Sequence, residues 1–159
     1  RFDWRSFHFW LVALIGLGLL LNLLRALLPA HGAVDPLAYH LALPKLYLLR
    51  HYISFERTLT GALYPDNIGM LFLFAIGLRD ATLAQVVHWF MGATTAVAIW
   101  CFCRRYFDSR VGVWAAAIYA FTPVFVFFSP VSYVDVGVGL FQFLGIWALF
   151  NWLRGGGRR

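Results

Sequence analysis

The chain has 159 residues, of which 62% are hydrophobic, 19% are aromatic and 13% are charged, and its mean hydropathy is positive. This composition excludes a soluble globular domain and indicates an integral membrane protein. The formal net charge of +6 is assigned to membrane lipids rather than nucleic acid, because basic residues gather at the cytoplasmic ends of membrane helices and at anionic headgroups.

Four apolar runs have the length of about 20 residues that a helix needs to cross a bilayer. A fifth run, at 68–78, reaches about half of a ~30 Å hydrocarbon layer, so we expect it to be interfacial or re-entrant. The sequence therefore predicts an all-α integral membrane domain with four transmembrane helices and a long outer loop at 30–80. The predicted spans are 9–28, 81–103, 111–129 and 136–153.

Charged residues predict the orientation of these four spans. One side carries eight basic residues against two acids, whereas the other carries four of each. We expect the first side, which includes the N terminus, to be cytoplasmic. Its basic residues are Arg1, Arg5, Arg104, Arg105, Arg110, Arg154, Arg158 and Arg159.

The outer loop is far longer than the usual connection of about four to six residues, and loops of this size tend to be functional. We predict amphipathic helices at about 36–53, broken at Pro44, and at 67–78. Asp35 followed by Pro36 is a helix-start signal, so the simplest structural role of Asp35 is an N-cap.

A second acid, Asp135, begins the fourth predicted span, and the topology brings it to the same face as Asp35. It too has a structural alternative as a helix cap. His88 lies inside the second span and is interpreted as a satisfied hydrogen-bond partner between helices. Pro123 predicts a kink in the third span.

Several segments together resemble the N-terminal part of a GT-C glycosyltransferase. They are D-P-L-A-Y-H-L-A-L-P-K-L-Y after the first span, Y-P-D-N before the short apolar run, R-R-Y-F, and S-P-V-S-Y-V-D. The chain is similar to the family 39 group, which includes protein O-mannosyltransferases and the aminoarabinose transferase of lipid A. The resemblance covers the first four helices of a fold that usually has eleven or more, so we expect the chain to be part of a longer protein.

This resemblance implies an inverting transferase that uses a sugar linked to a polyprenyl phosphate, with a protein, lipid or glycan as acceptor. Asp35 matches the acid thought to deprotonate the acceptor, and Asp135 matches a supporting or metal-binding acid. The resemblance is compatible both with a divalent cation and with none, so no cofactor is assigned. Gly69 departs from the family pattern, in which a Glu often precedes the Met. Candidates for binding the donor phosphate or the substrate are Tyr39, His40, Lys45, Arg50, His51 and Arg57.

The resemblance also implies an active site on the outer face of a bacterial plasma membrane. Two other classes of function are open. In a transporter, the outer loop would be a gate and the acids would couple to ions or protons. In a noncatalytic membrane subunit, Asp35 and Asp135 would be helix caps. Replacing Asp35 by Asn separates an enzyme from such a subunit, because Asn keeps the cap and removes the base.

Overall fold

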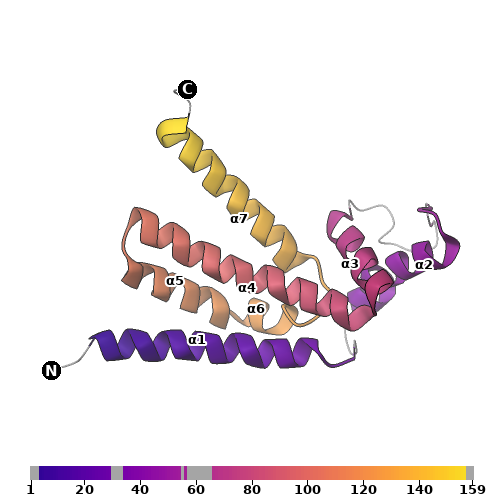
Figure 1. The fold of residues 1–159 in the computed structure, drawn as a ribbon, viewed down its shortest axis with the longest axis horizontal. Coiled ribbons are helices and arrows are strands. Elements are labelled where there is room, and N and C mark those ends of the chain that lie inside the picture. The colour runs from indigo at the N-terminus through magenta and orange to yellow at the C-terminus, as the bar shows by residue number, and fades with distance from the viewer. Residues whose placement is uncertain (1–3, 30–33, 55, 57–65, 157–159) are drawn as a thin grey trace.

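The computed structural model describes residues 4–29, 34–54, 56 and 66–156, and these residues form helices joined by turns. The predicted all-α architecture is confirmed. Helices α1, α4, α5 and α7 form the body of the molecule, and α2 and α3 lie together at one end (Figure 1). The helices are α1 (Trp4–Ala26), η1 (Pro36–His40), α2 (Ala42–Arg50), α3 (Asn67–Leu78), α4 (Ala81–Tyr106), α5 (Ser109–Phe121), α6 (Pro123–Phe128), α7 (Asp135–Asn151) and η3 (Trp152–Gly156).

The described residues contain three helices that are long and apolar enough to cross a membrane: Phe7–Ala26, Ala81–Tyr106 and Asp135–Gly155. They correspond to the first, second and fourth predicted spans. Many of their large hydrophobic side chains are exposed, such as Trp10 at 66% and Ile146 at 67%. An apolar surface of this extent is stable in lipid and not in water.

The third predicted span, at 111–129, consists of two helices. The kink expected at Pro123 is a complete break, with Thr122 in an extended conformation between α5 and α6. The ring of a proline clashes with a helical conformation of the residue before it, which explains why α5 ends here. That α5 and α6 cross the membrane as one segment stays a prediction.

The outer loop contains the expected short helices, but the predicted break at Pro44 is wrong. The interruption lies at Leu41, between η1 and α2, and Pro44 is the third residue of α2. Proline is tolerated there because the first N–H groups of a helix have no partner within it. Helix α2 ends at Arg50 and is followed by its C-cap residue His51, which has a left-handed conformation with φ of 59°.

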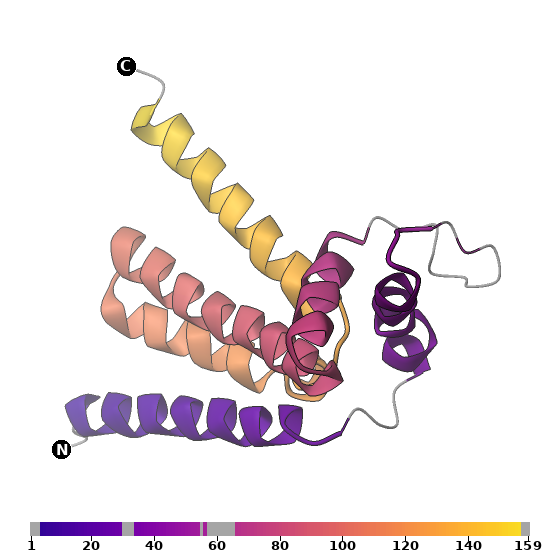
Figure 2. The same cartoon turned by 45° about the vertical axis from the view of Figure 1, so that its right-hand side comes forward.

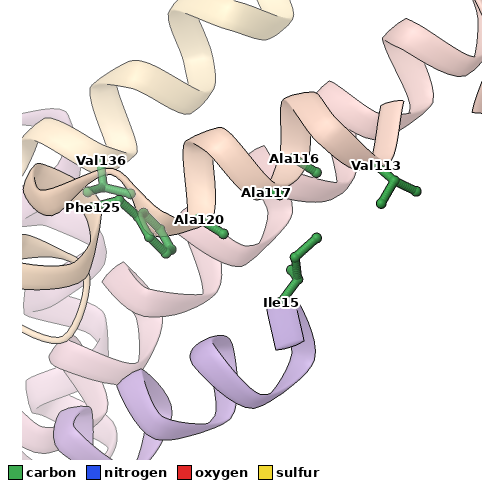
Figure 3. Close-up of a cluster of buried hydrophobic side chains, with 7 residues drawn as sticks. All are labelled: Ile15, Val113, Ala116, Ala117, Ala120, Phe125 and Val136. Carbon is green, nitrogen blue, oxygen red and sulfur yellow. The ribbon is translucent and has the colours of Figure 1, made fainter. Parts of the chain in front are cut away.

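Helix α4 is central, since it packs against α1, α3, α5 and α7. Gly112 of α5 lies so close to α4 that an added Cβ would be 2.9 Å from the carbonyl oxygen of Trp100. Small side chains of α5 continue this close packing. Figure 3 shows the resulting cluster of buried side chains, Ile15, Val113, Ala116, Ala117, Ala120, Phe125 and Val136.

Two views place the start of α1 and the end of α7 on the same side of the bundle. The start of α1 and the end of α7 lie away from α2 and α3 in both (Figures 1 and 2). We call their side the terminal end and the opposite side the α2–α3 end. The end of α1, the start of α4 and the start of α7 all lie at the α2–α3 end, so the two candidate acids are on the same side of the bundle, as the topology predicted.

Candidate functional site

Asp35 and Asp135 are both exposed at the α2–α3 end, and neither is the cap that local sequence suggested. Asp35 has helical backbone angles, with φ of −62° and ψ of −45°, and its side chain makes no capping hydrogen bond. Asp135 lies inside the first turn of α7, whose N-cap residue is Val134. The N-cap role predicted for Asp35 is therefore wrong, because a cap needs an extended backbone to turn its carboxylate onto the helix.

Three other aspartates do cap helices. The carboxylate of Asp66 accepts a hydrogen bond from the Gly69 N–H at 3.0 Å, and that of Asp80 accepts one from the Leu83 N–H at 3.1 Å. Asp108 accepts from the N–H groups of Arg110 and Val111. The chain thus has acids whose carboxylates are used by the fold and acids whose carboxylates are not.

Gly69, where the family pattern has a Glu, permits one of these caps. A Cβ added at Gly69 would lie 1.9 Å from an oxygen of Asp66. Any larger residue would push the carboxylate away from the start of α3. The glycine found here instead of the Glu of the family pattern is therefore explained by the cap at Asp66. Burial raises the pKa of Asp66, and its hydrogen bond from Gly69 opposes that shift.

His40 and Tyr133 both lie near Asp35 and Asp135. His40 is 7% exposed, and its ring centroid is 6.2 Å from that of Tyr133 and 4.2 Å from that of Tyr39. Burial lowers the pKa of His40 below its ordinary value of 6.5, while Asp35 and Asp135 act in the opposite direction. His40 is therefore neutral at pH 7 and can donate one N–H to a ligand.

The same two carboxylates shift the pKa of Tyr133. Partial burial raises the pKa of its phenol, and the charges of Asp35 and Asp135 raise it further. Both acids thus lie close enough to His40 and Tyr133 to act on them electrostatically. The structure brings together three residues predicted from sequence, Asp35, Asp135 and His40. It adds Tyr133, which sequence reasoning did not select.

His88 lies beneath this group, fully buried at 0% exposure. Its ring packs edge-on against Phe72, with centroids 6.2 Å apart, and neither ring nitrogen makes a hydrogen bond. The backbone of Ser129 and Val131 approaches the ring without reaching hydrogen-bond geometry. The interpretation of His88 as a satisfied partner between helices is wrong, because sequence cannot show whether a facing helix supplies an acceptor.

The hydroxyl of Ser132 is also buried without a hydrogen-bond partner. Ser132 belongs to the turn between α6 and α7, which passes over His88 and leads into Asp135. Buried polar groups without partners are costly and mark places where water or a ligand atom completes the bonding. The general rarity of ionisable residues inside spans was the available sequence signal for His88, whereas no signal pointed to Ser132.

Side chains of α1 and α4 hold these segments in place. The side-chain amide of Asn22 donates to the Ser129 hydroxyl at 3.2 Å, and Arg25 donates to the Val126 carbonyl at 2.7 Å. Gln85 of α4 donates to the carbonyls of Ala26 and Leu28 at the end of α1. These bonds attach the end of α1, which precedes Asp35, to α4 and to the turn that precedes Asp135.

The remaining candidates for phosphate binding are dispersed. Lys45 is exposed on α2, and His51 is exposed at the end of that helix. Arg50 donates hydrogen bonds to Ser54 and forms an ion pair with Glu56, so its charge is already compensated. Arg57 lies outside the described residues. Within the described part of the chain, no group of three or more His, Cys, Asp or Glu side chains is placed to hold a metal ion.

An apolar groove with a volume of about 330 Å³ lies between α4, α5, α6 and α7 and reaches Asp135. An apolar chain lying in this groove would have its polar end beside Asp135. The lining residues are Thr95, Ile99, Tyr119, Thr122, Val124, Phe125, Asp135, Val136, Gly139 and Phe143.

Comparison with known proteins identifies a family for this chain. Residues 70–157 match the model of a family described as dolichyl-phosphate-mannose-protein mannosyltransferase. The match covers more than half of the chain and includes His88, Ser132 and Asp135, while Asp35 and η1 precede it. Neither the curated proteins nor the solved structures contain a significant match to this chain.

Proposed function

Because the chain belongs to the dolichyl-phosphate-mannose-protein mannosyltransferase family of membrane GT-C glycosyltransferases, we propose that it transfers a sugar from a polyprenyl-phosphate donor to an acceptor hydroxyl with Asp35 as the general base. The observation that carries the proposal is the position of Asp35. It is exposed, makes no capping bond, and lies with Asp135, His40 and Tyr133. A carboxylate that the fold does not use for a cap is available to take a proton.

The reaction proceeds in one displacement. Asp35 removes the proton of the acceptor hydroxyl as its oxygen bonds to the anomeric carbon, and the bond from that carbon to the phosphate oxygen breaks. The polyprenyl phosphate leaves with the electron pair, and the configuration at the anomeric carbon inverts. Asp135 supports the site, and the neutral ring of His40 donates a hydrogen bond to the substrate.

The site faces the outside of a bacterial plasma membrane in this proposal. The support is the charge of the terminal end, where Arg5, Arg104, Arg105, Arg110 and Arg154 lie. Cytoplasmic ends of membrane helices carry such an excess of basic residues. The acceptor is a protein, a lipid or a glycan that approaches from the outer face.

The test measures transfer of labelled sugar from a panel of polyprenyl-phosphate donors by membranes that contain the protein. Replacing Asp35 by Asn should lower transfer by roughly 10²- to 10⁴-fold, the usual contribution of a general base. The matched control is Asp80→Asn, because it removes the same charge at the same end of the bundle and Asn still caps α4.

Equal activity of the native protein and Asp35→Asn would exclude Asp35 as the base. A comparable loss in Asp80→Asn would show a general effect of charge at this end. Absence of transfer from every donor in the panel, with the protein correctly folded, would favour a transporter or a noncatalytic subunit.

A further inference from the structure

A second groove lies at the terminal end, away from the proposed active site. It runs between α1, α4 and α5 and has a volume of about 690 Å³. It shares no lining residue with the groove beside Asp135, although Thr95 and Ala96, which are neighbours on α4, line one groove each. The lining residues are Arg5, His8, Phe9, Val12, Ile15, Leu19, Ala96, Val97, Trp100, Ser109, Arg110, Val113 and Ala116.

The polar and apolar lining residues are separated along the groove. On α1, the lining side chains from Arg5 to Leu19 recur at helical spacing and lie on one face. This stretch rises about 21 Å at about 1.5 Å per residue. Its first turn is polar, with Arg5 and His8, and the rest is apolar. The groove therefore has a cationic mouth at the terminal end and an apolar course toward the centre of the bundle.

On α5, too, the polar lining residues lie at the mouth and the apolar ones lie farther in. Helix α5 contributes Ser109 and Arg110 in its first turn and then Val113 and Ala116. On α4, Trp100 lies nearest the mouth, and the guanidinium of Arg104 is 5.2 Å from its ring centroid. A third arginine thus lies beside the groove.

The carboxylate of Asp108 is near this mouth but is used by the fold. It accepts hydrogen bonds from the backbone N–H groups of Arg110 and Val111, and it does not line the groove. Among the described residues, three arginines, Arg5, Arg104 and Arg110, thus lie at or beside the mouth, and the one acid near it has its carboxylate bonded to backbone N–H groups.

We infer that this groove binds one anionic diacyl phospholipid from the membrane leaflet at the terminal end. Its phosphate lies at Arg5 and Arg110, and one acyl chain lies along Val12, Ile15 and Val113. Cationic residues at the membrane surface attract anionic headgroups, and an apolar course places the chain in continuity with the bilayer. The charge at one end and the apolar length behind it fit this ligand better than a soluble anion, which would leave most of the groove empty.

The inference is independent of the proposed transfer reaction, and its test measures lipid binding. The purified protein in a mild detergent is titrated with phosphatidylglycerol or with phosphatidylcholine of the same acyl chains, and bound lipid is counted by native mass spectrometry. Phosphatidylglycerol should bind at least tenfold more tightly. In Arg5→Gln/Arg110→Gln, its affinity should fall roughly 30-fold, since each of the two basic residues near a membrane surface contributes about 1 kcal/mol.

The matched control is Arg105→Gln/Arg154→Gln, which removes the same charge at the same end. These arginines stack on Tyr106 and do not line the groove. The control should keep the preference for phosphatidylglycerol. Val97→Trp, at a lining residue that is 56% exposed, should fill the apolar course and weaken both lipids without disturbing the core.

Three outcomes would overturn the inference. Equal binding of the two lipids to the native protein would exclude recognition of charge. An equal loss of binding in both arginine pairs would assign the effect to the overall charge of this end. Binding of polyprenyl phosphate in preference to phosphatidylglycerol would assign the groove to the donor lipid.

Discussion

The two ends of the bundle treat their charged groups differently. At the terminal end, Asp108 caps α5 with two hydrogen bonds, and Arg154 stacks on the rings of Tyr106 and Phe150. At the α2–α3 end, Asp35 makes no capping bond, and His88 is buried with both ring nitrogens unbonded. Asp66 and Asp80 also cap helices at the α2–α3 end, so caps are common to both ends. The α2–α3 end differs because it also holds Asp35, whose carboxylate is not used for a cap and is available for chemistry.

The largest expected effect is on sugar transfer, when one aspartate at each end of the bundle is replaced by asparagine. Asp135→Asn should lower sugar transfer on the order of 100-fold, because it removes the charge of the supporting acid beside His40. Asp108→Asn makes the same change at the terminal end and keeps a good cap, so transfer should stay at the native level. A transfer assay at matched expression checks both, and similar activities would remove the functional distinction between the ends.

The next effect concerns packing at the terminal end. Gly112→Ala should lower the free energy of unfolding by about 1–3 kcal/mol, because its Cβ would press on the Trp100 carbonyl, which is backbone and cannot turn aside. Gly139→Ala is the control, since a Cβ there meets nothing within 4 Å and alanine favours a helix. Unfolding in detergent followed by circular dichroism measures the difference, and equal stabilities would contradict the close packing of α4 and α5.

A smaller effect on stability distinguishes an aspartate that caps a helix from one that does not. Asp108→Ala should cost about 1 kcal/mol of stability, the usual value of an N-cap. Asp35→Ala should leave the free energy of unfolding unchanged, because no capping bond is lost. The same unfolding measurement compares the two variants. If Asp35→Ala lowered the free energy of unfolding as much as Asp108→Ala does, Asp35 would have to be a cap.

The smallest effect is a dependence of stability on pH at the α2–α3 end. Burial lowers the pKa of His40 in the folded protein below 6.5, so the unfolded chain binds more protons when the pH falls. The stabilisation from neutral His40 is therefore complete above about pH 6.5 and is lost as the pH falls toward the folded-state pKa.

We expect His40→Gln to unfold with a weaker dependence on pH between 7.5 and 5.5 than the native protein. His51→Gln, which replaces an exposed histidine of the same loop, serves as the control and should behave as the native protein does. An unchanged pH dependence in His40→Gln would show that His40 does not contribute in this range.

Local sequence was sufficient for the features that depend on one segment of the chain. Hydropathy located α1, α4 and α7, and the proline at 123 marked the break between α5 and α6. Hydropathy and proline patterns can be read from sequence because their energies come from neighbours along the chain. The caps at Asp66, Asp80 and Asp108 also join residues two or three positions apart, but they were not predicted, and the cap predicted at Asp35 is not formed.

The site required the packing of distant segments. The bond from Asn22 to Ser129 joins residues 107 positions apart, and the approach of Asp135 to His40 brings together residues of α7 and η1. Periodicity says which face of a helix is apolar but not which atoms of another helix it meets. For this reason the charge of Asp35 was visible in the sequence, whereas its freedom from a capping role and the unbonded state of His88 depended on the tertiary structure.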